Sequence, residues 1–275
     1  MEKNPIVSVN LPTYNGEKTI DRALKSVLEQ TYKNYEIIVV DHYSKDNTIK
    51  IARKYTDKIF FDKKRILNSR KIGLEKSSGE IILFLSCDQV LSKDLLERTV
   101  KLFRNSHVDM VINEERAFEP RTIVEKMTDL DRKIVHQLRE TNPSKSVLLP
   151  STYKKEILKE VLEKINDKIL SEVTIHEHAI IYYEAYKISK RVGYLDNAVF
   201  HEEPKTIWEL FHHYFMWGRR ARRSKKIISS EYHNMFESKL ANRLRSINLF
   251  NLEVIPTLPI TFLKGSGYKL GYYFG

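Results

Sequence analysis

The chain contains a single cysteine, Cys87, among its 275 residues. One cysteine excludes a disulfide within the chain, and the first five residues do not have the pattern of a signal peptide. Both observations favour the reducing environment of the cytoplasm. No run of 18 apolar residues occurs, so the sequence predicts no transmembrane helix.

Two glycine-rich phosphate-binding signatures are also missing. No G-x-G-x-x-G follows the first predicted strand, and no G-x-x-x-x-G-K-[ST] occurs anywhere in the chain. These absences exclude the usual dinucleotide-binding sheet and the P-loop proteins. A bound diphosphate would therefore need a cation or basic side chains.

Positive charge is in excess, with 47 Lys and Arg against 36 Asp and Glu, which gives a net charge of +11. Such a balance favours polyanionic partners, namely nucleic acid, an anionic membrane surface or a phosphorylated substrate. Much of the excess lies in residues 219–226, where six of eight positions are cationic. Nucleic acid is the disfavoured partner, because no recognition motif accompanies this basic block.

Short apolar runs alternate with amphipathic segments in the first hundred residues. Strands are expected near 6–11, 36–41, 59–61 and 79–85, and helices near 17–30, 44–52 and 68–76. This alternation predicts an α/β fold with a mostly parallel sheet and helices on both faces. Since parallel strands end at one edge, residues 12–15, Asp41 and Asp88 are expected to share a crevice. Taken alone, Asp88 fits a turn cap equally well.

The second half of the chain has a less regular pattern. Strands are expected near 108–112, 147–149, 192–195 and 198–200, and helices near 94–103, 123–138, 154–164, 178–190 and 206–226. The aromatic stripe of the last helix is interpreted as packing. Residues 247–275 are rich in Leu, Ile, Phe and Tyr but interrupted by Pro and Gly. This segment is suited to lie in a membrane interface rather than to span it.

Four segments, in this order, resemble the family 2 glycosyltransferases. They are 11–15 (Leu-Pro-Thr-Tyr-Asn), 36–48 (with its Ile-Ile-Val-Val-Asp and Asp-Asn-Thr), 69–74 (Ser-Arg-Lys-Ile-Gly-Leu) and 79–88 (ending Ser-Cys-Asp). Weaker similarity follows at 177–204 and 208–219. The resemblance implies the GT-A fold, inversion at the anomeric carbon, a nucleotide-activated sugar and Mg²⁺ or Mn²⁺. It also implies a GT-A domain over 1–226, with a nucleotide-binding half (1–104) and an acceptor half (105–226), and a helical, apolar extension over 227–275.

The resemblance implies roles for individual residues as well. The nucleotide sugar would be held by Pro12, Tyr14, Asn15, Glu17, Asp41, Arg70, Ser86, Asp88 and Arg219. Asp88 matches the metal-binding acid of the family's Asp-x-Asp motif, and His201 matches a histidine near the metal. Ser86 replaces the first acid of that motif, and a hydroxyl is a far weaker metal ligand than a carboxylate.

The general base is a second departure from the family pattern. Where the family has Glu-Asp at the start of a helix, this chain has Glu177 and His178, which are both candidate bases. An imidazole, with an ordinary pKa of ~6.5, suits that role at neutral pH. For His176 and for the pair at 212–213, an exposed or hydrogen-bonded histidine is the preferred interpretation.

These features imply a metal-dependent, inverting transferase of the hexosyltransferase type, with a UDP-sugar favoured over a GDP- or dTDP-sugar. The acceptor would be a polyprenyl phosphate, a lipid-linked saccharide or a growing glycan. The basic block and the apolar end favour a peripheral protein on the cytoplasmic face of an anionic membrane. The alternative is a catalytically weak sugar-nucleotide-binding protein, because two of the family's acids are missing.

Overall fold

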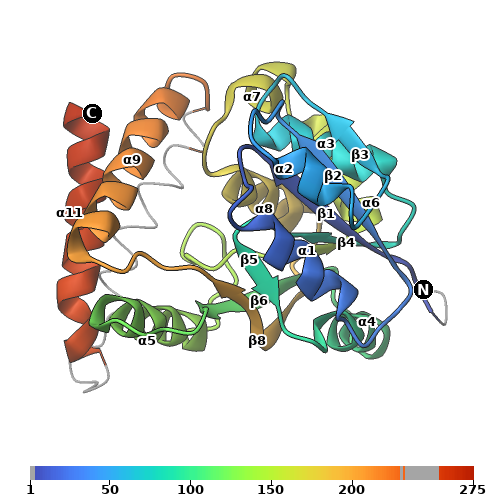
Figure 1. Cartoon of the computed structure of the whole chain (residues 1–275), viewed down its shortest axis with the longest axis horizontal. Helices are drawn as coiled ribbons and strands as arrows, with labels where there is room; N and C mark the ends of the chain where they lie inside the picture. Colours follow the sequence, from blue (N-terminus) through green and yellow to red (C-terminus); the bar gives the residue numbers. More distant parts are fainter. Residues whose placement is uncertain (1–3, 230–231, 233–253) are drawn as a thin grey trace.

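The computed structural model describes residues 4–229, 232 and 254–275. Within them, an eight-stranded sheet has the order β3-β2-β1-β4-β7-β6-β8-β5 (Figure 1). Its strands are β1 (Val7–Thr13), β2 (Tyr35–Asp41), β3 (Ile59–Phe61), β4 (Ile81–Phe84), β5 (Gln89–Leu91), β6 (Met110–Ala117), β7 (Thr152–Lys154) and β8 (Val192–His201). Strands β5 and β7 run antiparallel to their neighbours, and the other pairs are parallel. The predicted mostly parallel sheet is confirmed.

Helices cover both faces of the sheet. One apolar core joins the sheet to α1 (Ile20–Leu28), α2 (Thr48–Ala52) and α4 (Leu95–Asn105). The core on the other face includes α3 (Ile66–Lys76), α6 (Lys155–Lys164), α7 (Asp167–Glu172) and α8 (Glu177–Ile188). Alternate residues of β4 enter the two cores, so Leu83 packs on the α1 side and Phe84 on the α3 side.

Two strand predictions in the second half were wrong. The apolar run at 147–149 is not a strand, and β7 begins two residues beyond Pro150 instead. Proline has no N–H to donate to a sheet, so the ladder begins only after it. The two short strands expected at 192–195 and 198–200 form one strand, β8, whose pairing with β6 shifts register between Asn113 and Glu115. Strand β5 and helix α7, three and six residues long, were not predicted.

The carboxyl-terminal part of the chain contains two long helices that lie side by side at one end of the molecule (Figure 1). Helix α9 (Ile207–Lys225) packs on α11 (Leu258–Phe274), and α5 (Ile123–Gln137) contacts α11 near its start, where the 3₁₀ turn η1 (Ile255–Thr257) precedes it. The predicted helical carboxyl-terminal extension is confirmed for residues 254–275, and residues 230–231 and 233–253 of the predicted extension lie outside the described residues. None of the described helices combines the length and hydropathy that crossing a bilayer requires.

Candidate active site

The carboxyl ends of β1, β2 and β4 bring the predicted nucleotide-binding segments to one edge of the sheet. Thr13 at the end of β1 lies opposite Asp41 at the end of β2. Past the end of β4, the backbone N–H of Leu85 donates to Asn10 of β1 at 3.0 Å. The turn after β1 also touches the loop after β4, because a Cβ on Gly16 would lie 3.2 Å from Cys87 Sγ. The shared edge expected from the sequence is therefore present.

The turn after β1 is braced against the loop that follows β2. Asn15 adopts a left-handed backbone conformation (φ 49°), and its Oδ1 accepts a hydrogen bond from the Lys45 N–H at 2.9 Å. Glu17 Oε2 accepts from the backbone N–H of Asn47 at 3.0 Å. The side chains of Asn15 and Glu17 thus hold the loop at 44–48 in place.

The other predicted nucleoside contacts differ in accessibility. Pro12 and Asp41 are buried, and the two carboxylate oxygens of Asp41 accept hydrogen bonds from the backbone N–H and the hydroxyl of Ser44, at 2.7 and 2.5 Å. Tyr14, in contrast, is 54% exposed and meets the His42 ring edge-on at a centroid distance of 5.5 Å. An exposed aromatic ring offers a stacking surface to a nucleobase.

Asp88 and His201, the two predicted metal ligands, are adjacent. Gln89 of β5 pairs with His201 of β8, and this pairing brings Asp88 Oδ2 to 3.3 Å from His201 Nε2. Burial disfavours the charged imidazole, but the hydrogen bond and the charge of Asp88 outweigh burial and raise the pKa of His201 to about 9. Burial acts against ionisation of Asp88 as well, and His201 reverses the effect and lowers the pKa of Asp88.

The side chains of this pair fit a divalent cation whose remaining ligands would come from the substrate. Among the described residues, no group of three or more His, Cys, Asp or Glu side chains is arranged to hold a metal ion. Mg²⁺ sites commonly use one or two carboxylates, several waters and the oxygens of a substrate phosphate, and imidazole also suits transition metals. The 43% exposed carboxylate of Asp88 could supply one such ligand, and His201 Nε2 a second only after losing the proton that its contact with Asp88 retains.

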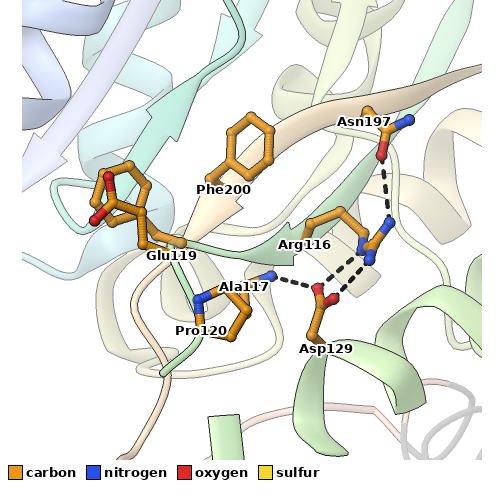
Figure 2. Close-up of a pocket in the computed structure, with 8 residues that line it drawn as sticks. Arg116, Ala117, Glu119, Pro120, Asp129, Asn197 and Phe200 are labelled. Carbon is orange, nitrogen blue, oxygen red and sulfur yellow. Dashed lines mark hydrogen bonds and ion pairs between the residues drawn. The ribbon is translucent and has the colours of Figure 1, made fainter. Parts of the chain in front are cut away.

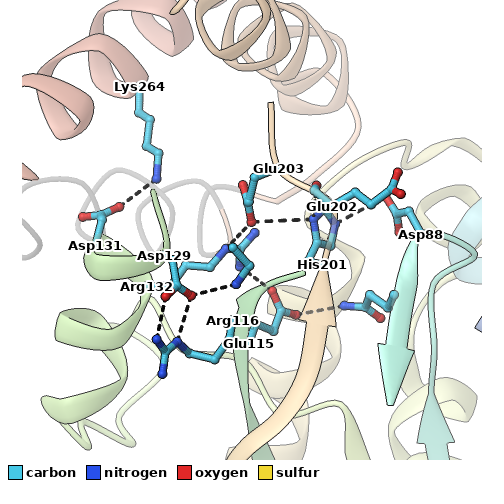
Figure 3. Close-up of polar contacts among 12 residues, drawn as sticks. Asp88, Glu115, Arg116, Asp129, Asp131, Arg132, His201, Glu202, Glu203 and Lys264 are labelled. Atoms are coloured by element: carbon cyan, nitrogen blue, oxygen red, sulfur yellow. Dashed lines mark hydrogen bonds and ion pairs between the residues drawn. The ribbon is translucent and has the colours of Figure 1, made fainter. Parts of the chain in front are cut away.

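A chain of polar contacts lies behind His201 and returns to the loop that carries Asp88 (Figure 3). Glu203 Oε1 lies 3.7 Å from His201 Nδ1 and accepts a hydrogen bond from Arg132 Nε at 2.5 Å. Arg132 Nη1 also donates to Glu115 at 2.6 Å.

The same chain continues through Gln89, whose amide N–H donates to Glu115 at 3.0 Å and whose Oε1 accepts from the Ser86 N–H at 2.9 Å. Arg132 thereby links both sides of the candidate metal site. Sequence reasoning missed Arg132, Glu115 and Glu203, because no motif or spacing connects residues of α5, β6 and the segment after β8.

Arg70 and the two predicted bases form a second, buried cluster. The side chain of Arg70 is fully buried over the Phe84 ring, with its guanidinium 4.4 Å from the ring centroid. Its Nη2 lies 2.8 Å from His178 Nε2 and 3.8 Å from Glu177 Oε1. The other two nitrogens, Nε and Nη1, have no hydrogen-bond partner among the described residues.

Burial sets the protonation of this cluster. It lowers the pKa of Arg70 to about 10, although the charge of Glu177 opposes the shift. Burial and then the Arg70 charge hold the pKa of His178 well below its usual range, so the ring is neutral and accepts the Arg70 hydrogen bond. A backbone hydrogen bond with Pro150 opposes this shift of His178.

Helix α9 begins six residues after His201 and carries a third histidine of interest, His213. Burial and then the charge of His201 lower the pKa of His213 to about 4, while Asp88 opposes the shift, so His213 lies within electrostatic reach of both. No motif or spacing in the sequence predicted this proximity. Arg219 lies instead beside Gly275, since its Cβ and Cγ are 3.1 Å from the position of a Cβ on that glycine.

A pocket of about 360 Å³ opens at the end of β6 (Figure 2). Its lining consists of Arg116, Ala117, Phe118, Glu119, Pro120, Asp129, Asn197 and Phe200. Neighbouring residues of a strand point to opposite faces, so Phe200 and His201 project to opposite sides of β8. Arg116 already forms two hydrogen bonds with Asp129, at 2.8 and 2.5 Å. Because Phe200 lines it, the pocket opens on the side of β8 opposite to His201.

Known proteins with related sequences are glycosyltransferases. The sequence profile of glycosyl transferase family 2 matches residues 8–181. An uncharacterized glycosyltransferase of Haemophilus influenzae is 34% identical over 113 residues, which are 38% of this chain and 45% of that protein. Poly(ribitol-phosphate) beta-N-acetylglucosaminyltransferase TarS of Staphylococcus aureus is 28% identical over 159 residues, which are 52% of this chain and 28% of that protein. The chain thus spans less than half the length of these two relatives.

Solved structures share the fold. The structure of S. aureus TarS 1–349 in complex with UDP-GlcNAc superposes with a TM-score of 0.60 at 20% identity, over 97% of this chain and 81% of that one. The mannosyltransferase PcManGT from Pyrobaculum calidifontis, in complex with GDP-Man and Mn²⁺, superposes with a TM-score of 0.59 at 18% identity, over 97% of this chain and 73% of that one. The chain therefore belongs to glycosyl transferase family 2 and has the GT-A fold.

Proposed function

We propose that the protein transfers a sugar from a nucleoside diphosphate sugar to an acceptor, with inversion at the anomeric carbon. The observation that carries this proposal is the meeting of the Tyr14 turn, the Asp41 loop and the Asp88–His201 pair at one edge of the sheet. Ligands of open α/β sheets bind at such an edge. The complexes of TarS with UDP-GlcNAc and of PcManGT with GDP-Man support donors of this class, and we favour a UDP-sugar over a GDP- or dTDP-sugar.

In this proposal the nucleoside stacks on the exposed ring of Tyr14, and Asn15 and Glu17 keep the loop at 44–48 in position beside it. Asp41 accepts a hydrogen bond from an N–H of the base, and Pro12 contacts the nucleoside. Ser86 reaches the ribose.

Arg70 faces the diphosphate in this proposal. Its two unpartnered nitrogens support this role, because a buried guanidinium N–H without an acceptor costs free energy that a phosphate oxygen would recover. Arg219 would contribute only from the last third of α9, where it lies beside Gly275.

In this proposal Asp88, with His201 once its Nε2 has lost a proton, would hold Mg²⁺ or Mn²⁺. When bound, such a cation neutralises the charge that builds on the departing diphosphate. The Glu202 carbonyl, 2.7 Å from His201 Nδ1, fixes the ring facing Asp88, and Glu203, held by Arg132, adds a charge 3.7 Å from the same nitrogen, so these groups act by positioning.

A hydroxyl acceptor requires a general base, and we assign that role to Glu177 before His178. The Nε2 lone pair of His178 accepts the Arg70 hydrogen bond at 2.8 Å, so His178 would have to give up this bond before it could take a proton. Glu177 has only one oxygen directed at that cluster, 3.8 Å from Arg70 Nη2. An acceptor that is a lipid phosphate is already anionic and requires no base.

We propose that the acceptor is a polyprenyl phosphate, a lipid-linked saccharide or a growing glycan, met at the cytoplasmic face of a membrane. The replacement of the usual acid by His178 and the basic block at 219–226 support an acceptor carried by lipid. Nucleic acid remains the disfavoured partner.

A thermal-shift panel tests the proposal. UDP-, GDP- and dTDP-sugars are compared with and without Mn²⁺. A ligand at 100 times its Kd stabilises the folded state by about 2.7 kcal/mol, which corresponds to a rise in Tm of roughly 5–10 °C. We expect that rise with one donor class in the presence of Mn²⁺. No shift with any donor would contradict the proposal, and binding without sugar transfer would favour the catalytically weak binding protein.

A further inference from the structure

Helix α11 has an apolar face that points away from the protein. Its inner side is anchored, because Ile260 is buried against α5 and α9 and the buried Lys264 Nζ donates to Asp131 of α5 at 2.7 Å. The outer side of α11 carries large exposed apolar residues at helical spacing, namely Phe262, Leu270 and Tyr273, with Phe274 beside them. The turn η1 before the helix adds the exposed Ile255. Phe262 and Phe274 are 77% and 81% exposed. The exposed Lys269 lies on the same side. Large apolar side chains gathered on one exposed side of a helix indicate an interaction site.

The basic block lies at the same end of the molecule as the last turn of α11. Helices α9 and α11 run in the same direction, since Gly267 faces the carbonyl of Phe211 and Gly271 that of Phe215. At their carboxyl ends, Arg222 Nη1 donates to the carbonyls of Tyr273 and Gly275 at 3.3 and 2.9 Å. Figure 1 shows the carboxyl ends of α9 and α11 on the same side of the molecule.

All six cations of the block are exposed: Arg219, Arg220, Arg222, Arg223, Lys225 and Lys226. No Asp or Glu occurs in residues 210–229 or 254–275, so neither segment carries acids that would neutralise them. Exposed aromatic side chains and cations therefore lie together at one end of the paired helices. Aromatic residues favour the headgroup level of a bilayer, and cations are attracted to anionic lipid there.

We propose that the carboxyl ends of α9 and α11, with the outer face of α11, dock on the surface of an anionic lipid bilayer. A polyanion such as RNA would use the cations but leave the apolar face in water. The charge and the apolar stripe together therefore favour lipid. This inference rests on the proposed function, which it deepens by naming the surface that would bring a lipid-borne acceptor to the enzyme. Because α9 begins six residues after His201, docking would hold the active site near the bilayer.

Co-sedimentation of the full chain with vesicles tests the inference. Phosphatidylcholine vesicles are compared with vesicles that also contain phosphatidylglycerol, at low and high salt. We expect the protein to sediment with the anionic vesicles only, and less at high salt because the attraction is screened. Trp217, 39% exposed, lies about two turns before the end of α9, so its emission should shift to the blue on binding, whereas Trp208 lies at the opposite end of the helix.

Two pairs of substitutions separate the charged and the apolar contributions. Each cation near an anionic surface contributes about fivefold to partitioning, so Arg223→Gln with Lys226→Gln should weaken binding about 30-fold. The matched control, Lys101→Gln with Lys159→Gln, makes the same charge change on α4 and α6 and should leave binding unchanged.

Leu270→Ser with Phe274→Ser should weaken binding at least about tenfold, since each loses apolar area that enters the interface. Its control is Leu28→Ser with Phe61→Ser, which removes the same residue types from positions that are 43% and 46% exposed.

Three outcomes would overturn the inference. The first is a protein that ignores anionic vesicles at low salt. The second is equal binding to neutral vesicles. The third is an unchanged affinity of the Leu270/Phe274 variant alongside tight binding to RNA, which would assign the basic block to nucleic acid. The thermal response to sugar nucleotides is measured on the same samples, so a failure of docking is distinguished from a failure of the proposed transferase activity.

Discussion

Replacement of Arg132 by methionine should destabilise the protein by about 2–4 kcal/mol. Arg132 is 25% exposed and links Glu203, 5% exposed, to Glu115, 34% exposed. Burial opposes its charge, but Glu203 and Glu115 outweigh this effect and raise the pKa of Arg132 above its ordinary value. Removal of one partner of a buried ion pair costs about 3–5 kcal/mol, and the partial exposure of Arg132 and Glu115 reduces that figure.

Urea unfolding at neutral pH measures this change. The control is Arg121→Met, which removes an ion pair with Glu119 whose side chains are 84% and 64% exposed. An exposed pair contributes about 0–1 kcal/mol. In a double-mutant cycle, Arg132→Met combined with Glu203→Gln should be less destabilised than the sum of the two single changes, by about 1 kcal/mol or more. If Arg132→Met costs no more than Arg121→Met, the reasoning about this network is refuted.

Other predictions concern the donor site, acid stability and helix packing. Arg70→Met should stay folded but weaken sugar-nucleotide binding by roughly 10- to 100-fold in calorimetry, because a charged hydrogen bond is lost; an unchanged Kd would contradict this role. Despite the opposing effect of burial, hydrogen bonds from Lys58, Ser8 and Ser78 lower the pKa of Glu36 to about 2. Its contribution to stability should thus be complete above the unfolded-state pKa of ~4.3 and disappear as pH falls towards 2. Glu36→Gln should therefore lower the urea midpoint at pH 6 but not at pH 2, and equal effects at both pH values would refute this. Gly271→Ala should cost about 1–3 kcal/mol, since its Cβ would lie 1.9 Å from the Phe215 carbonyl oxygen, whereas Gly265→Ala in the same helix has open space and should stabilise by up to about 1 kcal/mol. Similar melting temperatures for the two glycine variants would contradict the close packing of α9 and α11.

The sequence predicted those parts of the fold whose signal is local. The run at 81–85 is apolar and ends in Ser-Cys-Asp, so both the buried strand β4 and the position of Asp88 at its end could be inferred. The neighbouring strands β1 and β2 gave the same signal, and the edge they share followed from the rules for parallel sheets. Strand β7 lacks such a signal, because its three residues are defined by pairing with β4 and β6.

The candidate site could be predicted only in part, for the same reason. Asp88 and His201 were expected near one another, and the structure gives their separation of 3.3 Å. The contacts of Arg132 with residues 17 and 71 positions away follow from tertiary packing and leave no periodic pattern in the chain. The neutral state of His178 likewise depends on burial beside Arg70, which residue identity alone does not reveal.

The most direct test of the proposed function is the rate of transfer or hydrolysis of a radiolabelled sugar nucleotide in the presence of Mn²⁺, compared between the wild type and Asp88→Asn. Loss of one group that stabilises developing charge typically lowers a rate by ~10²–10³, and we expect a loss of that size. Asp94→Asn is the matched control, because Asp94 is 54% exposed, contacts Arg98 and should be dispensable. A rate for Asp88→Asn close to that of the wild type and of Asp94→Asn would contradict the assignment of this edge of the sheet as a sugar-nucleotide site.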